Sequence, residues 1–374
     1  MSSNPPHHAT VAPWPGPSPA PWPQPPTRPR IVGLATAVPG EAVDQQTVFD
    51  TVYRQAFGGV PGAERLFCEA GVERRHGFHD PRTDARATAL STGERMRIWK
   101  AGAMALGRDA VGRLLAQGVD RDSVGHFVMA SCTGYDTPSP DILLAKEFGL
   151  PKTLRRSFLG HVGCHAGLTA LRTGVDALAA RPGAATALVH CTEISSAHVR
   201  TTDHSLEQVL CQALFADASA ALALSVEEGR PGPEVLGTHT ETLYAGSDHM
   251  GWSIGDDGFK MRLSPLLPFA IGGEVAGFTQ RLLAPLGLRT NDVHCWGVHP
   301  GGPRILDAVE RALSLPQDAL DPSRRVLAAH GNCSSATIFL VLERLLAAAP
   351  PPGAFGVLLA FGPGLTFEGT VLRF

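Results

Sequence analysis

From Ile31 onward, short apolar runs alternate with segments whose apolar residues recur at every third or fourth position. Short apolar runs indicate buried strands, and the three-and-four spacing indicates amphipathic helices. Leu168, Leu171, Val175 and Leu178 follow the second pattern and would line one face of a helix. The alternation along the chain therefore predicts an α/β fold.

One local design, a strand followed by a turn of small residues and then a helix, occurs three times. We expect its strands at 157–159, 293–298 and 326–329. Each turn carries one reactive side chain just past the carboxyl end of its strand, which is where α/β folds build their sites. The three side chains are those of Cys164, His299 and Asn332.

The two ends of the chain differ from the rest. Residues 1–30 are rich in proline, which lacks the donor N–H and fixes φ, so we expect a disordered tail. At the other end, residues 355–361 and 366–374 are strand-like runs around a Gly-Pro-Gly turn. Because glycine permits such a turn, we expect these runs to form a hairpin.

Composition bounds the class of protein. A chain of 374 residues with 44% hydrophobic content can bury a large core, in one large or two fused domains. The net charge of −3 gives no general attraction to nucleic acid or to anionic membranes. No apolar run approaches the roughly 20 residues that span a bilayer, and the N-terminus lacks a secretory pattern. We therefore expect a cytoplasmic protein with neither a membrane span nor a nucleic-acid partner.

Cys164 is the candidate nucleophile among the seven cysteines. None of the seven stands two to four residues from another, so we expect free thiols and no metal site. Cys164 would begin a helix, whose unpaired N–H groups stabilise a thiolate. An imidazolium of His299 would lower the pKa of the thiol further. We expect His165 to point away from Cys164, as a structural or surface residue.

Asn332 would supply a neutral partner, because an amide can only donate or accept hydrogen bonds. With His299 it could form an oxyanion hole for a thioester oxygen. Such a hole suits the decarboxylation of a malonyl thioester, which places negative charge on the carbonyl oxygen and needs no base. Cysteine, histidine and asparagine in this order also describe papain-like proteases, although the C-G-[SA]-C-[WY] signature of those enzymes is missing here.

Four segments carry a resemblance to a known family. They are Gly163-Cys164 with its following helix, 296–303, 331–335 and 361–364, the last preceded by Ala360 in place of a glycine. At these segments the chain resembles the chalcone synthase-like, type III polyketide synthase family of the thiolase superfamily. The resemblance covers nearly everything after the proline-rich tail. It implies a five-layered αβαβα fold of two similar halves, here residues 31–230 and 231–374, assembled as a homodimer.

The resemblance also implies substrates and a mechanism. Cys164 would take a starter acyl group from acyl-CoA, and His299 with Asn332 would stabilise the enolate formed by decarboxylation of malonyl-CoA. The enolate would attack the Cys164 thioester, and further rounds would precede cyclisation. CoA thioesters are then substrates, and no cofactor is expected.

The family pattern assigns further residues to the cavity and to CoA. Phe215 matches the first of two gatekeepers between the CoA tunnel and the cavity, and Met261 stands at the second, where plant enzymes usually have phenylalanine. Other cavity positions are matched by Cys132, His198, Trp252 and Ser334. Basic residues that would bind the CoA phosphates are Arg304, Arg74 and Arg75. The departures from plant enzymes favour an alkylpyrone, an alkylresorcinol or a related phenol as the product.

Three other interpretations stay open. A ketoacyl synthase III-like enzyme would use the same three reactive residues but stop after one condensation. A cysteine hydrolase would release a free acid without consuming malonyl-CoA. A non-catalytic binding protein could keep the fold, although retention of all three reactive residues argues against it.

Overall fold

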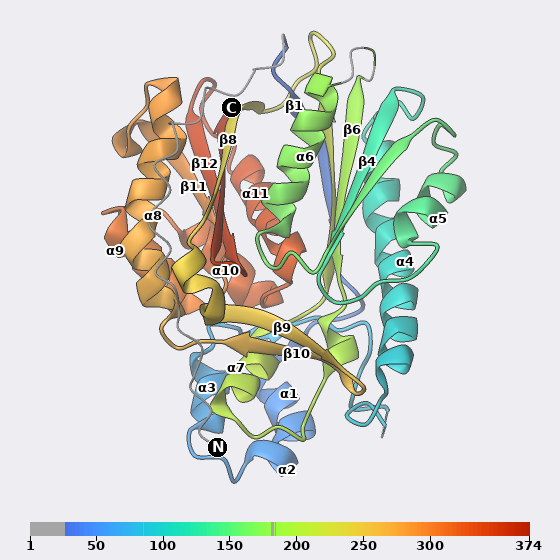
Figure 1. Cartoon of the computed structure of the whole chain (residues 1–374), viewed down its shortest axis with the longest axis vertical. Coiled ribbons are helices and arrows are strands. Elements are labelled where there is room, and N and C mark those ends of the chain that lie inside the picture. The colour runs from blue at the N-terminus through green and yellow to red at the C-terminus, as the bar shows by residue number, and fades with distance from the viewer. Residues whose placement is uncertain (1–26, 85, 181–182, 184) are drawn as a thin grey trace, which may run out of the picture.

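The structure is a computed structural model, and it describes residues 27–84, 86–180, 183 and 185–374. Most of the predicted proline-rich tail, residues 1–26, lies outside the described residues. Nine strands are hydrogen-bonded in the order β11-β12-β13-β8-β1-β7-β6-β4-β5. At the centre of this order, β1 meets β8 through a single residue pair, Arg30 with Glu234. On either side of that contact the strands form two separate layers (Figure 1).

The first layer belongs to the N-terminal half of the chain. Its strands are β1 (Arg30–Ala37), β4 (Val124–Ser131), β5 (Arg155–Gly160), β6 (Thr186–Glu193) and β7 (Ala218–Ser225). Every residue of β6 and β7 is buried. Helices α4 (Thr92–Ala116) and α5 (Pro140–Glu147) cover the outer face, and α6 (Ala166–Ala180) covers the inner face (Figure 1).

The second layer repeats this design with the C-terminal half. Its strands are β8 (Glu234–Thr242), β11 (Val293–Val298), β12 (Phe355–Gly362) and β13 (Thr366–Arg373). Helices α8 (Leu267–Leu283) and α9 (Pro303–Ala312) lie on the outer side, while α11 (Thr337–Ala347) lies beside α6 between the layers (Figure 1). The result is the predicted αβαβα arrangement.

Strand directions show that the two halves are alike. In the first half, β4 pairs with β6 in parallel, and β6–β7 and β7–β1 are antiparallel. In the second half, β11 pairs with β12 in parallel, and β12–β13 and β13–β8 are antiparallel. The exact boundary that we placed between residues 230 and 231 stays a prediction.

One predicted strand is wrong. Residues 326–329 belong to helix α10 (Asp321–His330), whereas the other two predicted strands lie within β5 and β11. The apolar run suggested a buried strand because Val326 and Leu327 are both buried, but they are neighbours on a helix. This helix begins with an Asp-Pro pair. That pair is a helix-start signal, since proline suits the first turn. The predicted C-terminal hairpin is confirmed by the β12–β13 pairing.

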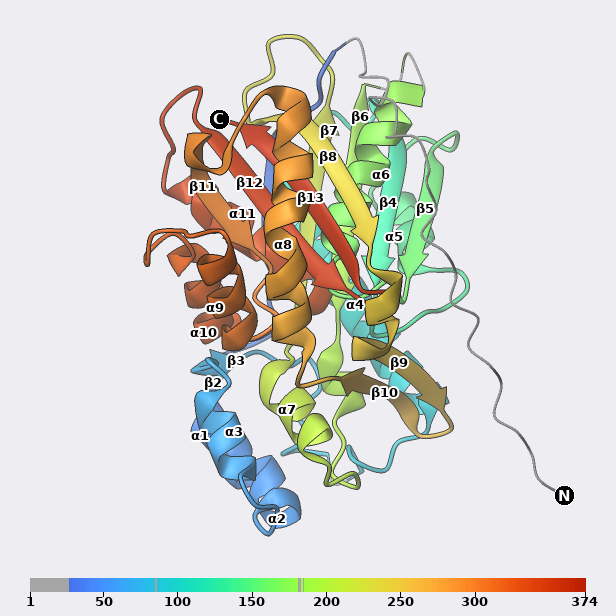
Figure 2. The same ribbon diagram turned by 60° about the vertical axis from the view of Figure 1, so that its left-hand side comes forward.

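Short elements gather below the layers, where the carboxyl ends of the parallel strands point (Figures 1 and 2). They include a two-stranded hairpin of β9 (Met250–Gly255) and β10 (Gly258–Leu263), packed on α7 (Leu206–Leu214). The N-terminal elements here are β2 (Val43–Asp44), α1 (Gln45–Val48), η1 (Phe49–Tyr53), α2 (Arg54–Phe57), α3 (Ala63–Glu69) and β3 (Arg74–Arg75). Short 3₁₀ helices are η2 (Ser195–His198), η3 (Tyr244–His249), η4 (Ala284–Leu286), η5 (Thr290–Asp292) and η6 (Ser334–Ala336).

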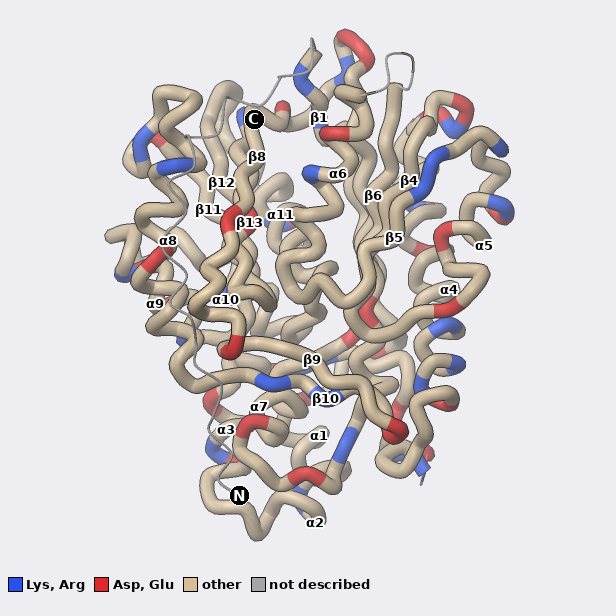
Figure 3. The backbone as a smooth tube through the Cα atoms, in the orientation of Figure 1, with Lys and Arg blue, Asp and Glu red and all other residues tan. Residues whose placement is uncertain are grey.

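Charged residues lie mainly on the outer helices and loops, with both signs mixed (Figure 3).

All seven cysteines are free thiols. In the described part of the chain, no helix has the length and apolarity needed to cross a membrane. No group of three or more potential ligands that could hold a metal ion occurs among the described residues.

Candidate active site

The turn that carries Cys164 is built against the C-terminal hairpin. Gly163 has φ of +104°, and a Cβ placed there would lie 2.1 Å from Cδ of Pro363. A Cβ on Gly362 would likewise lie 2.1 Å from Nδ1 of His165. Both positions therefore require glycine, and two motifs about two hundred residues apart in sequence are in van der Waals contact.

Cys164 is buried just before the first turn of α6, with 4% of its surface exposed. Burial raises the pKa of the thiol to about 12, and hydrogen bonding from the Ser334 and Asn332 side chains opposes this rise only in part. The nearby carboxylate of Glu193 raises the pKa further. Burial therefore favours the protonated thiol.

His299 follows β11 directly and extends its pairing, because the backbone N–H of His299 donates to the Leu359 carbonyl at 2.8 Å. The imidazole is 2% exposed, and within the described residues neither ring nitrogen has a hydrogen-bond partner. Burial lowers the pKa of His299 to about 3, and His165 lowers it further through its charge. Burial thus disfavours the charged form of both groups, and the thiolate–imidazolium pair expected from the sequence stays a prediction.

His165 is a buried residue rather than a surface one, with 4% of its area exposed. Burial lowers its pKa to about 4, and it lies near enough to His299 to influence that pKa. Its position against Gly362 agrees with a structural role.

Asn332 has its amide oriented by the backbone that follows it. Its Oδ1 accepts a hydrogen bond from the Ser334 N–H at 2.8 Å, which leaves the NH₂ group to donate elsewhere. The amide contributes a hydrogen bond that lowers the pKa of Cys164, so it lies beside that sulfur. Ser334 holds φ of +45°, a conformation uncommon for a residue with a side chain, and its hydroxyl also faces Cys164.

A cavity of about 160 Å³, which we call the catalytic cavity, collects six of the predicted residues. They are Cys164, His299, Asn332, Phe215, Met261 and Arg304. The nucleophile comes from one half of the fold and the histidine and asparagine from the other. The structure thus brings together the three reactive side chains.

A second and larger cavity of about 510 Å³, the hairpin cavity, lies between the β9–β10 hairpin, α7 and the N-terminal elements. Its walls include Trp252, His198 and Arg75, together with Phe215 and Met261. The last two side chains therefore border both cavities. That position agrees with the gatekeeper role that the family pattern assigns to them.

The remaining predicted residues are placed differently. Cys132 lies under the turn that carries Cys164, which we call the nucleophile turn. Its Sγ contacts both the N–H (3.0 Å) and the carbonyl (3.3 Å) of Gly163. Arg75 is buried and donates to the carbonyls of Gln212 and Phe215 at 2.7 and 3.0 Å, so it supports the segment that carries Phe215. Arg74 is exposed and borders neither cavity.

Glu193 lies at the site although no sequence motif points to it. It ends β6, is fully buried, and accepts hydrogen bonds from the Cys132 N–H and from the hydroxyls of Thr133 and Ser335. These donors come from both halves of the fold, so the carboxylate holds the two halves together behind Cys164. An acidic residue at the end of a strand rich in apolar residues was the available signal, because a buried charge needs partners.

Comparisons with known proteins agree with this geometry. The family model described as the N-terminal domain of chalcone and stilbene synthases matches residues 78–227, and the model of the C-terminal domain matches residues 236–374. The chain belongs to the chalcone and stilbene synthase family. It is a type III polyketide synthase, and therefore an acyltransferase.

Similar members of the family come from bacteria. The chain is 33% identical over 360 residues to a 3,5-dihydroxyphenylacetyl-CoA synthase of Streptomyces toyocaensis, covering 93% of this chain and 90% of that relative. It is 36% identical to a 1,3,6,8-tetrahydroxynaphthalene synthase of Streptomyces peucetius subsp. caesius, covering 84% and 85%. An alpha-pyrone synthesis polyketide synthase-like protein of Mycobacterium tuberculosis is 32% identical, with 91% and 89% covered.

Solved structures of type III polyketide synthases share the fold. The 1,3,6,8-tetrahydroxynaphthalene synthase of Streptomyces coelicolor superposes with a TM-score of 0.87 at 25% identity, covering 92% of this chain and 99% of that one. The C-terminal polyketide synthase domain of Steely1 from Dictyostelium gives a TM-score of 0.86 at 27% identity, with the same coverage. The thiolase-like fold predicted for this synthase is thereby confirmed.

Proposed function

We propose that this synthase loads an acyl group from acyl-CoA onto Cys164 and extends it repeatedly with malonyl-CoA. The observation that carries the proposal is the catalytic cavity, in which a thiol, an imidazole and an oriented amide meet. CoA thioesters are the substrates, and we propose that no separate cofactor takes part.

Loading begins from a neutral pair. As the Cys164 sulfur attacks the carbonyl carbon of the acyl-CoA, its proton passes to His299, which is neutral and so able to accept it. The bond between carbonyl and CoA sulfur then breaks, and the imidazolium returns the proton to the departing CoA. A neutral starting pair suits a buried site, because separated charges would be costly there.

Extension uses His299 and Asn332 together as hydrogen-bond donors. When malonyl-CoA loses carbon dioxide, the negative charge passes to the thioester oxygen, where His299 and the NH₂ group of Asn332 donate hydrogen bonds. The enolate carbon then forms a bond to the acyl carbon on Cys164, and the C–S bond to Cys164 breaks. The longer chain returns to Cys164 for another round.

The hairpin cavity would receive the growing chain. Phe215 and Met261 stand between it and the catalytic cavity, so a chain on Cys164 would pass between their side chains. Cyclisation there would give an alkylpyrone, an alkylresorcinol or a related phenol. Relatives named for an alpha-pyrone and for a dihydroxyphenyl and a tetrahydroxynaphthalene product support this range.

We also propose that the enzyme is a cytoplasmic homodimer. The cytoplasm supplies CoA thioesters, and β5 stands at one end of the strand order with an edge that a second copy could pair with. Size-exclusion chromatography with light scattering tests the dimer. A monomer at micromolar concentration would contradict it.

The test of function is incubation with malonyl-CoA and a panel of acyl-CoAs from acetyl to long-chain, followed by mass spectrometry. Products that exceed the starter by several decarboxylated malonyl units support the proposal. A single added unit would favour the ketoacyl synthase III-like alternative, and free acid with malonyl-CoA untouched would favour a hydrolase.

A further inference from the structure

The β9–β10 hairpin carries two of the residues that the family pattern assigns to the acyl cavity. Met261 and Trp252 face each other across its strands, and both line the hairpin cavity. A two-stranded hairpin is marginally stable by itself, so its position depends on what anchors it. Its base is anchored on α7, where Gln208 donates to the Met261 carbonyl at 2.5 Å.

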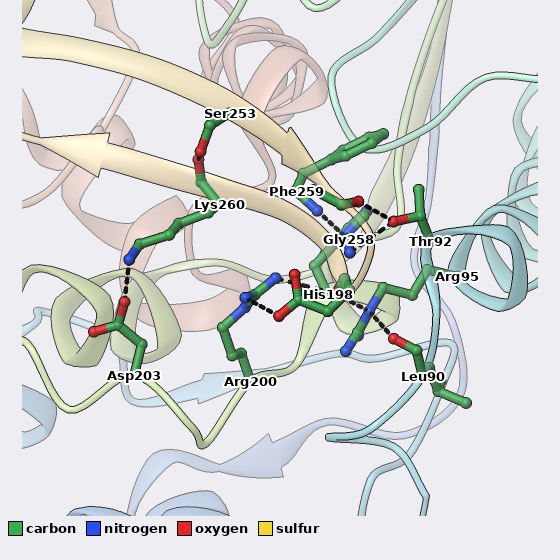
Figure 4. A network of polar contacts seen from close by, with 12 residues as sticks. Leu90, Thr92, Arg95, His198, Arg200, Asp203, Ser253, Gly258, Phe259 and Lys260 are labelled. Atoms are coloured by element: carbon green, nitrogen blue, oxygen red, sulfur yellow. Dashed lines mark hydrogen bonds and ion pairs between the residues drawn. The ribbon is translucent and has the colours of Figure 1, made fainter.

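The tip of the hairpin is anchored by a buried arginine from the N-terminal half of the chain. Arg95 lies on α4 and is 1% exposed. Its Nε donates to the carbonyl of Leu90 at 3.1 Å (Figure 4) and to that of Asp257 at 2.9 Å. Its Nη1 donates to the carbonyls of Ala197 and Val199 at 2.6 and 3.2 Å. One guanidinium therefore joins the hairpin tip to the segment that follows β6.

The packing around this guanidinium is close. Gly258 at the tip has φ of +109°, and a Cβ there would lie 2.5 Å from Cδ of Arg95. Arg200 strengthens the same point through a 2.5 Å ion pair with the Asp257 carboxylate. Thr92, one turn before Arg95, accepts a hydrogen bond from the Gly258 N–H at 2.8 Å. The tip is thus held from two sides.

The tip also reaches the nucleophile turn. Phe259, the next residue along β10, stacks on His198 with ring centroids 4.6 Å apart and meets His161 edge-on at 4.8 Å. His161 belongs to the turn between β5 and Cys164. A shift of the hairpin tip would therefore move the gate and the approach to Cys164 together.

We propose that Arg95 is a positioning residue for acyl-chain selection: it fixes the hairpin tip and, through it, Met261 at the gate and the turn before Cys164. The proposal rests on the proposed function for its kinetic consequences. Its structural part, the anchoring of the hairpin, does not depend on what the enzyme synthesises. Loss of the anchor would loosen starter selection and let malonyl-CoA be decarboxylated without condensation.

The test compares Arg95→Lys with the matched control Arg97→Lys, which changes an exposed arginine on the same helix. Lysine keeps the charge but presents its donors from one nitrogen, so it cannot reach carbonyls on several sides at once. We expect Arg95→Lys to speed hydrogen exchange of the hairpin amides and to change the kcat/KM ratio of long to short starters by about tenfold or more. Carbon dioxide released per condensed product should rise, and Arg97→Lys should match the wild type in all three measurements.

A folded Arg95→Lys variant with unchanged exchange in the hairpin, or with an unchanged starter ratio, would overturn the proposal. If Arg95→Lys does not fold, Thr92→Val decides the question by the same two measurements, since it loosens the tip from a half-buried position. If the wild type consumes no malonyl-CoA, the proposed function fails instead. The exchange comparison then still decides whether Arg95 anchors the hairpin.

Discussion

Phe215 and Asn332 form an isolated parallel bridge between the end of α7 and the loop after α10. The Asn332 N–H donates to the Leu214 carbonyl at 2.8 Å, and the Ala216 N–H donates to the Asn332 carbonyl at 3.0 Å. The proposed gate residue Phe215 of one half of the fold is therefore in register with Asn332, the proposed oxyanion donor, of the other half. We expect this bridge to couple the width of the proposed gate to the position of the Asn332 amide.

Replacing Cys164 by alanine separates the two chemical steps. The variant should load no starter, because the nucleophile is gone, yet it should keep some malonyl-CoA decarboxylation, because His299 and Asn332 remain. Intact-protein mass spectrometry measures loading, and gas release or acetyl-CoA formation measures decarboxylation. Synthesis of full-length polyketide by Cys164→Ala would remove Cys164 from its proposed role.

Met261→Phe should shift preference towards smaller starters. Met261 is 4% exposed and borders both cavities, so a larger and stiffer ring would narrow the passage. A difference of a methylene or more in such a passage changes selectivity by about tenfold or more. Competition between a short and a long acyl-CoA gives the ratio, with Met261→Leu as the volume-conserving control. An unchanged ratio in Met261→Phe would contradict gating by this side chain.

Arg304 and Arg74 should differ in their effect on CoA binding, although both are exposed. Only Arg304 borders the catalytic cavity, so Arg304→Ala should raise KM for acyl-CoA by about fivefold, equivalent to about 1 kcal/mol, with kcat little changed. The effect should shrink at high ionic strength, because salt screens an exposed charge. Arg74→Ala serves as the control and should leave KM unchanged. Equal effects of the two substitutions would contradict this distinction.

The α/β class and the reactive residues could be predicted because both leave local signals, whereas the five-layered arrangement was implied by the family resemblance. Two of the three strand–turn–helix units, the C-terminal hairpin and the proximity of Cys164, His299 and Asn332 follow from hydrophobic spacing and from the general placement of sites in α/β folds. The third unit failed because four consecutive apolar residues fit a strand as well as one turn of α10. Short runs carry too little periodicity to separate the two.

What the sequence could not supply depends on burial in three dimensions. The helix terminus at Cys164 suggested a lowered thiol pKa, but desolvation is the larger effect and raises it. The roles of Glu193 and Arg95 could not be predicted from the sequence, because their partners are backbone groups and hydroxyls brought from distant segments. Such partners leave no motif, since any residue can offer a carbonyl or an N–H.

The buried histidines should make the protein acid-labile. Burial lowers the pKa of His165, His190 and His198 to about 4 and that of His299 to about 3, from an ordinary value of 6.5. Between these values the unfolded chain binds more protons than the folded one, so the free energy of unfolding falls as the pH drops below 6.5. Asp217 acts in the opposite direction, because burial raises its pKa to about 6 and the folded state then binds the extra proton.

Six described histidines have a lowered pKa, because His161 and His330 join the four above, whereas burial raises the pKa of three carboxyls, those of Asp217, Glu193 and Asp176. The histidines therefore decide the sign. Each net proton contributes at most about 1.4 kcal/mol per pH unit to the slope of unfolding free energy against pH. Urea unfolding at several pH values between about 7.5 and 5 measures that slope. His198→Gln should remove the contribution of about one proton from this slope. His294→Gln, at an exposed position, should leave the slope unchanged. A slope in His198→Gln equal to that of the wild type would mean that His198 already titrates in the folded protein, and its contact with the Thr133 carbonyl at 2.6 Å would then hold a charged ring.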